Sequence, residues 1–107
     1  MKVKNNDIHI TRGDSEGIGV KFNNYELQAD DVVELTVRKD VRSEQVIHKV
    51  AEHMEDGSAL ITINPEDTEK LDFGCYVYDI QMTFASGSVK TLVKPAKFFI
   101  GGEVTYD

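Results

Sequence analysis

The longest regular pattern of hydrophobic and polar positions lies between Leu71 and Phe84. From Tyr76 onward every second residue is aromatic or aliphatic, and the residues between them are mostly polar. Alternation with a period of two residues is typical of a β-strand with one buried face, because successive side chains point to opposite sides of the strand. The stretch therefore predicts a strand whose core side carries Tyr76, Tyr78, Ile80, Met82 and Phe84.

The residues just before this strand predict how the chain enters it. Asn64 suits the N-cap of a helix and Pro65 suits its first position, so we expect one helical turn there. Asp72-x-Gly74-x-Tyr76 follows. A strand, one helical turn and Asp-x-Gly-x-Tyr are typical of the tyrosine corner of an immunoglobulin-like sandwich, in which the tyrosine hydroxyl bonds to the backbone where the chain crosses between sheets. We therefore expect Asp72, Gly74 and Tyr76 to form such a corner.

The rest of the chain divides into short apolar segments separated by polar or glycine-containing turns. Glu52–Ser58 is expected to be a polar loop with a turn at Asp56-Gly57. Pro95 predicts a bulge or break in the last strand, because proline has no N–H to donate. About seven strands predict one all-β, immunoglobulin-like sandwich domain over residues 1–107. The further predicted strands are Asp7–Arg12, Gly17–Phe22, Val32–Lys39, Val46–Val50, Ala59–Ile63 and Val89–Ile100.

Charge and cysteine content narrow the functional classes. The chain has 107 residues, of which 40% are hydrophobic, and a formal net charge of −7. This acidic balance argues against nucleic acid and against an anionic membrane as partners, since both attract basic patches. The opening MKVKNNDIHI lacks the apolar core of a signal peptide. The chain has a single cysteine, Cys75, so it cannot form an internal disulfide. We expect a soluble protein made in a reducing cytoplasm, with Cys75 half-buried and inert.

The candidate catalytic and metal-binding residues show no converging pattern. The three histidines, His9, His48 and His53, have no metal-ligand spacing, and no nucleophile motif is present. The acidic pairs lack the Asp-x-Asp-x-Asp spacing of a calcium loop, and we expect them in solvated loops. We therefore expect no enzyme, cofactor or metal site. A calcium- or carbohydrate-binding sandwich is the alternative, and it would use the acidic pairs Asp30-Asp31, Glu55-Asp56 and Glu66-Asp67.

One tripeptide invites a further functional interpretation. Arg12-Gly13-Asp14 spells the integrin-binding sequence. Glycine followed by aspartate at the end of a strand is also what a turn requires. We interpret the tripeptide as a turn.

Several segments together resemble a known family. These are Ile10-Thr-Arg-Gly-Asp-Ser15, the stretch Tyr25–Lys39, Gly74-Cys-Tyr-Val-Tyr-Asp-Ile80 and the hairpin Ser86-Gly87-Ser88. They resemble the immunoglobulin-like domain at the N-terminus of phage baseplate upper proteins and small prophage structural proteins of Gram-positive bacteria. The chain departs from the larger baseplate proteins by stopping at Asp107, without a receptor-binding head. The resemblance implies a non-enzymatic structural module that assembles with other virion proteins and with copies of itself. It also implies a location in the virion, or in the bacterial cytoplasm before assembly.

The last predicted strand suggests where such assembly takes place. It contains three consecutive bulky apolar residues, Phe98-Phe99-Ile100, but a strand directs only alternate side chains inward. We expect Phe98 and Ile100 in the core and Phe99 on the other face. An apolar residue there, close to the break at Pro95, is typical of a sheet edge that a partner covers. The candidate interface residues are Phe99, Pro95 and Val93.

Overall fold

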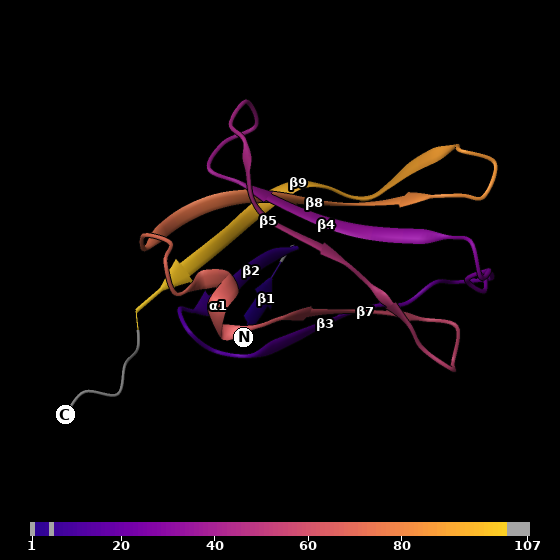
Figure 1. Cartoon of the computed structure of the whole chain (residues 1–107), viewed down its shortest axis with the longest axis horizontal. Coiled ribbons are helices and arrows are strands. Elements are labelled where there is room, and N and C mark those ends of the chain that lie inside the picture. The colour runs from indigo at the N-terminus through magenta and orange to yellow at the C-terminus, as the bar shows by residue number, and fades with distance from the viewer. Residues whose placement is uncertain (1, 5, 103–107) are drawn as a thin grey trace.

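The computed structural model describes residues 2–4 and 6–102, which form two β-sheets packed face to face as an immunoglobulin-like sandwich (Figure 1). The larger sheet has six strands in the order β1-β2-β9-β8-β4-β5, and the smaller has the order β3-β7-β6. One short helix, α1, joins β7 to β8. The bounds are β1 Lys2–Lys4, β2 Asp7–Thr11, β3 Glu16–Val20, β4 Val32–Arg38, β5 Gln45–Val50, β6 Glu52–His53, β7 Ala59–Ile63, α1 Pro65–Thr68, β8 Gly74–Thr83 and β9 Val89–Gly101.

The core lies between the sheets and is built from the alternating positions of the strands. In β8 the four residues from Tyr76 to Met82 that were predicted to face inward are buried, and Phe84, just beyond the strand, is half-buried against the same core. Phe98 is completely buried and its ring meets that of Tyr78 edge to face, with centroids 5.9 Å apart. The period-two pattern therefore placed the faces of the central strands correctly, because burial of one face is what selects such a pattern.

Two short strands were not predicted from the sequence. β1 precedes the first predicted strand, and β6 begins what we expected to be a loop from Glu52 to Ser58. β6 spans only two residues and pairs with the edge of β7. A strand this short has no sequence period, so tertiary pairing alone defines it. The expected turn is present behind it, where Gly57 has a φ of 84° and donates its N–H to the Met54 carbonyl at 3.1 Å.

The last strand, β9, is covered along only part of its length. β2 runs parallel to it and pairs with Phe98–Gly101, while β8 pairs with β9 antiparallel on the other side. Within the described residues no strand pairs with the outer side of Val89–Lys97, which we call the free segment of β9. The register with β8 shifts twice close to Pro95, which confirms the predicted irregularity. The larger sheet therefore has an open edge along β9, next to the Asp7 end of β2.

At one end of the sandwich, α1 and the start of β8 are tied to the first strands; we call this the corner end. The Tyr76 hydroxyl donates to the Asp72 carbonyl at 2.8 Å, which is the hydrogen bond of a tyrosine corner. Inside α1, the Asp67 carboxylate accepts the Asn64 backbone N–H at 2.7 Å. Thr68 is completely buried, and its hydroxyl accepts the N–H of Gly13 at 2.9 Å. The helical turn thus links the corner to the loop that follows β2.

The Arg-Gly-Asp sequence belongs to the same end of the molecule. The Arg12 guanidinium lies over the Phe73 ring, 4.1 Å from the ring centroid. The backbone N–H of Arg12 donates to the Gly101 carbonyl at 2.9 Å. Gly13 has a φ of 87°, a conformation that costs glycine little. Asp14 donates its N–H to the Thr11 carbonyl at 3.1 Å and closes the turn. The tripeptide therefore serves as the predicted turn.

Candidate functional site

The structure places the three predicted interface residues in three different environments along β9. Val93 is half-buried and faces the space between the sheets, where it lies opposite Ile80 of β8. Pro95 is exposed at the register shift. Phe99 is half-buried on the outer face of the large sheet. The three residues share a strand but do not form one patch.

Phe99 lies on the side of β9 away from the core, as predicted, while Phe98 and Ile100 are buried. It does not lie at an open edge, however, because β2 covers this part of β9 and places His9 directly opposite Phe99. The imidazole of His9 stacks on the Phe99 ring with centroids 4.4 Å apart. A parallel partner this close cannot be read from the pattern of a single strand. The open edge therefore lies in the free segment, and an interface role for Phe99 stays a prediction.

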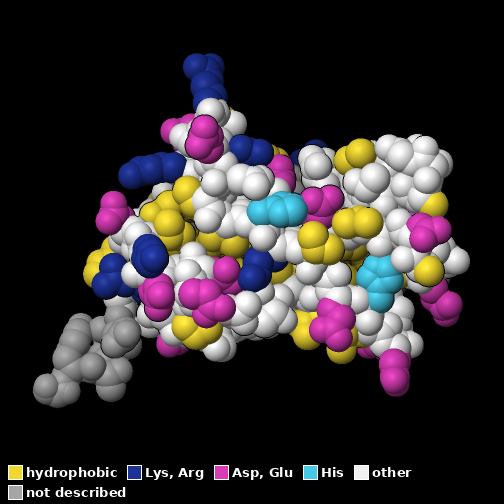
Figure 2. Space-filling model, viewed as in Figure 1, with side chains coloured by type: hydrophobic (Ala, Val, Ile, Leu, Met, Phe, Trp, Pro, Cys, Tyr) yellow, Lys and Arg dark blue, Asp and Glu magenta, His cyan; other side chains and the backbone are white. Residues whose placement is uncertain are grey.

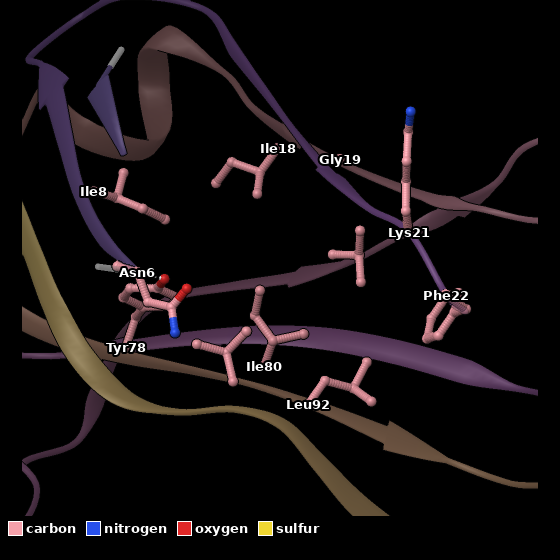
Figure 3. A pocket seen from close by; sticks show the side chains of 11 residues that line it. Asn6, Ile8, Ile18, Gly19, Lys21, Phe22, Tyr78, Ile80 and Leu92 are labelled. Carbon is pink, nitrogen blue, oxygen red and sulfur yellow. Dashed lines mark hydrogen bonds between the residues drawn. The ribbon is translucent and has the colours of Figure 1, made fainter. Parts of the chain in front are cut away.

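A groove of about 520 Å³ opens between the sheets next to the free segment (Figure 3). Its walls come from β2, β3, β8 and β9. In Figure 3, Ile18 of β3 and Ile80 and Leu92 of the large sheet point toward one another, whereas the Lys21 side chain points away. The lining is mostly apolar, and the groove residues Val20, Phe22, Leu92 and Val93 are only partly buried.

Two strands with open edges border this groove. β3 pairs with β7 and with no other strand in the described part of the chain. Opposite it runs the free segment of β9, whose exposed lysines are Lys90, Lys94 and Lys97 and which contains no acidic residue. Lys97 donates its backbone N–H to the Asp7 carboxylate at 3.1 Å. The first residue of β2 therefore bonds to β9 at the point where the pairing of the two strands begins. The groove thus combines apolar surface, unpaired strand edge and positive charge.

The surface as a whole carries both signs of charge, and Figure 2 shows acidic and basic side chains interspersed on the face that it presents. Two other hollows are present, and one of them, of about 680 Å³, is larger than the groove. A hollow of about 130 Å³ lies on the outer face beside Pro95, lined by Thr36 and Asp79 among others. A shallow depression next to β6 is lined by Glu52, His53 and the following turn. Neither hollow is bordered by both β3 and the free segment of β9.

The three histidines have separate local partners. His9 stacks on Phe99, and His48 Nε2 lies 2.6 Å from a Glu34 carboxylate oxygen across the strands. His53 Nε2 lies 2.7 Å from the Asp31 carbonyl oxygen. Within residues 2–4 and 6–102, no three His, Cys, Asp or Glu side chains lie together in a way that could hold a metal ion. The calcium alternative therefore gains no supporting geometry from these residues.

Asp31 contradicts the expectation that the acidic pairs are solvated. It is 3% exposed, and its carboxylate accepts hydrogen bonds from the Tyr25 hydroxyl and from the Gln28 N–H at 2.8 Å. These two donors lower the pKa of Asp31, and the same bond with the carboxylate raises the pKa of Tyr25. The sequence showed only two adjacent acidic residues, because the tyrosine that covers Asp31 comes from the preceding loop. Asp31 is thus a structural anchor.

The other acidic pairs are exposed in the main, but one member of each has a local partner. Asp56 accepts the Ser58 N–H at 3.0 Å, which contributes to a lowered pKa together with the stronger bond from the Ser58 hydroxyl. Asp67 forms an ion pair with Lys49 at 2.8 Å. Lys49 thereby links β5 of the large sheet to α1. These carboxylates serve the fold locally.

Cys75 also differs from expectation. It is exposed rather than half-buried, because it occupies the outward position next to the buried Tyr76 and opposite Phe99. Its sulfur contacts the Tyr76 carbonyl oxygen at 3.7 Å.

The groove and the free segment are candidate functional features that the sequence did not reveal as a site. A signal was nevertheless present, since lysines and proline are common on open edge strands, and β9 has Lys90, Lys94, Pro95 and Lys97 close together. The groove itself had no such signal, because its walls come from four strands spread over most of the chain.

Comparison with known proteins bears on the fold. The chain matches no protein-family model, and no curated protein matches its sequence. Its structure is similar to the crystal structure of CopC from Methylosinus trichosporium OB3b, with a TM-score of 0.51 and 15% identity over 94% of this chain and 89% of CopC. Likeness at this level of identity shows the fold, and it supports the β-sandwich architecture. No helix in the described residues is long and apolar enough to cross a membrane.

Proposed function

We propose that this protein is a non-enzymatic structural module that assembles with other proteins through the open edge of its large sheet. The observation that carries the proposal is the free segment, Val89–Lys97, which borders an apolar groove of about 520 Å³. An uncovered strand edge offers N–H and C=O groups to a partner strand, and edges of this kind are a common mode of protein recognition. The groove next to it adds apolar surface that a lone subunit leaves partly exposed.

The setting of this assembly follows from the sequence resemblance. The segments similar to phage baseplate upper proteins and prophage structural proteins support a role in a phage or prophage particle, with other virion proteins as partners. Repeated subunits of such particles surround a symmetry axis, so copies of this chain would be present in fixed proportion to the other components. The excess of acidic over basic residues would keep free subunits apart before assembly.

Mass spectrometry of purified particles tests the proposal. Particles induced from the bacterium that carries the gene should contain this chain in constant ratio to the major tail proteins. Deletion of the gene should remove the chain and give incomplete or non-infectious particles. Particles that are complete without the chain would overturn the virion role. A melting temperature that rises with calcium, and not with magnesium, would favour the ligand-binding alternative, because a ligand that binds only the folded state stabilises it.

A further inference from the structure

We propose that the groove and the free segment accept an extended segment of a different protein, in which apolar residues alternate with acidic residues. The segment would lie as an added strand beside Val89–Lys97. This inference rests on the proposed assembly function and names its docking site and the chemistry of its partner. Three properties of the site carry it: an empty strand position, an incompletely covered core, and a row of lysines.

The empty strand position lies beyond Asp7, the first residue of β2. β2 pairs with β9 from Ile8, opposite Phe98, to Thr11, opposite Gly101. The chain enters β2 at Asp7 from β1, which pairs on the far side of β2, and Asn6 at this reversal has a φ of 70°. The Tyr78 hydroxyl bonds to the Asn6 carbonyl and holds the reversal in place. In the described part of the chain no strand therefore occupies the line of β2 alongside the free segment, and a strand from a partner can continue it.

The core beneath this position is incompletely covered. Side chains of an added strand would point alternately to solvent and toward the groove. Those that point inward would meet Leu92 and Val93 from β9, Val20 and Phe22 from the β3 side, and Ile80, which lies at the groove floor (Figure 3). Val20, Phe22, Leu92 and Val93 are half-buried, so apolar side chains placed there remove further apolar surface from water. The partner segment therefore needs an apolar residue at every second position.

The charge of the site indicates which residues of the partner segment would lie between its apolar residues. Lys90, Lys94 and Lys97 are exposed along nine residues of strand that contain no Asp or Glu. Two carboxylates lie beside the segment: that of Asp7, at the start of β2, accepts the Lys97 backbone N–H, and that of Asp79 in β8 lies near Pro95. The three lysines outnumber these two carboxylates, although the chain carries −7 overall. Lys97 lies opposite Val77 on the outer face, where an acidic residue on the outward side of an added strand would complement it, and Lys90 lies opposite the buried Met82 on the groove side, at the hairpin end of the segment. Charge complementarity of this kind favours association and sets specificity.

The same charges disfavour a second copy of this chain as the occupant. An antiparallel pair of two free segments would place lysines against lysines. The other edge strands of the large sheet, β1 and β5, contain no acidic residue, and the edge strands of the small sheet contain one each, Glu16 in β3 and Glu52 in β6. Lysine on an edge strand discourages pairing between identical molecules. No edge strand in the described residues offers a row of acidic residues, so an acidic strand from another protein is the complementary partner.

Synthetic peptides as long as the free segment provide the probe. One alternates Val and Ile with Asp and Glu, the second replaces every acidic residue by Lys, and the third keeps the acidic composition but groups the apolar residues together. Fluorescence anisotropy at low salt should show tightest binding of the alternating acidic peptide, weakened by added salt. Backbone amide shifts in NMR spectra should concentrate at Val89–Lys94 and at Val20 and Phe22.

Charge reversal gives the decisive variants. Lys90→Glu with Lys94→Glu should weaken binding of the acidic peptide about tenfold and improve binding of the basic one, since two exposed ion pairs become repulsive. Lys39→Glu with Lys70→Glu, at exposed lysines outside β9, makes the same change in net charge and should leave both affinities unchanged. Val93→Arg should abolish binding, whereas Val50→Arg at an exposed position of β5 should not. If Val93→Arg fails to fold, the lysine variants still decide the question.

The proposal is overturned if the acidic and basic peptides bind equally, if the grouped peptide binds as well as the alternating one, or if the shifts map to other edges. It is also overturned if the protein alone dimerises with shifts at the groove, because the occupant is then a second copy. Particle composition is an independent result. A chain present in particles that does not bind the acidic peptide refutes this docking site and leaves the assembly role standing, whereas strand binding without incorporation refutes the virion role alone.

Discussion

The two ends of this sandwich are built differently. At the corner end the chain satisfies its own polar groups both between distant segments, as in the Gly13 N–H to Thr68 hydroxyl bond at 2.9 Å, and locally, as in the Tyr76 to Asp72 bond at 2.8 Å. At the groove end the contacts between the sheets are largely apolar and incomplete, and the polar bonds in that region join Tyr78 to Asn6 and Tyr25 to Asp31. Side chains that are fully buried and bonded fix one structure, whereas half-buried ones leave surface for a partner.

Partial cover by β2 explains the difference. β2 covers β9 at the corner end, where Phe98 and Ile100 are fully buried. It turns away at Asn6, and Leu92 and Val93 of β9, which line the groove beyond that point, are half-buried. We expect the corner end to carry more of the stability of the fold and the groove end to carry more of its binding capacity. Substitutions at the two ends test this division.

The largest effect is expected at Tyr76. Tyr76→Ala removes a buried aromatic ring and should lower the free energy of unfolding by about 3–5 kcal/mol. Tyr76→Phe keeps the ring and removes only the hydroxyl that bonds Asp72, so it should cost about 0.5–1.5 kcal/mol. Urea denaturation followed by circular dichroism measures both. An unchanged midpoint for Tyr76→Phe would show that the corner bond adds nothing to stability.

The next largest effect is expected at Thr68, which is completely buried in α1. Thr68→Val keeps the shape but removes the acceptor of the Gly13 N–H, and leaving that donor unpaired should cost about 1–3 kcal/mol. The same replacement at the exposed Thr62 of β7 is a matched control that should change stability by less than about 0.5 kcal/mol. Equal effects at the two threonines would mean that the corner end is not the tighter one.

A smaller loss of stability is expected in the groove. Leu92→Ala should cost about 0.5–1.5 kcal/mol, because a half-buried leucine contributes only part of the free energy of full burial. The midpoint of urea denaturation again gives the value. A loss as large as that of Tyr76→Ala would contradict the division of the molecule into a tight end and an open end.

The hydrogen bond between Tyr25 and Asp31 should make the stability of the fold depend on pH. Folding lowers the pKa of Asp31, so its contribution to stability is complete above the unfolded pKa of about 3.9 and is lost as the pH falls through the lower pKa of the folded state. The raised pKa of Tyr25 acts in the opposite range, where stability is lost as the pH rises above about 10. The wild type should be more stable than Asp31→Asn at pH 7, and this difference should shrink in acid. A difference independent of pH would show that the charged carboxylate is not what the tyrosine stabilises.

The smallest effect is expected from the lysines of the free segment. Lys90→Glu with Lys94→Glu should change the free energy of unfolding by less than about 0.5 kcal/mol, since both side chains are exposed. The same variant should alter peptide affinity strongly, as argued above for the groove. Thermal denaturation together with the binding assay separates the two properties. A large loss of stability would mean that these lysines serve the fold rather than a partner.

The sequence by itself determined the architecture and the faces of the main strands. The alternation from Tyr76 to Met82 identified the buried side of β8, and Asn64 and Pro65 identified the helical turn before the corner. Pro95 marked the irregularity of β9. These features are local, because strand alternation, helix capping and the missing N–H of proline act between residues that are neighbours in the chain.

Only the tertiary structure decided which strands lie side by side, and therefore where the candidate site is. The parallel pairing of β2 with β9 covers Phe99 and exposes Val89–Lys97, and the partner of Asp31 is a tyrosine six residues away in the same loop. The groove needs β2, β3, β8 and β9 at once. A pattern along one strand shows which side faces the core, but it does not show which strand comes next to it or where that neighbour ends. An edge is open where no neighbouring strand pairs with it. It can therefore be located only when the positions of all the strands in the sheet are known.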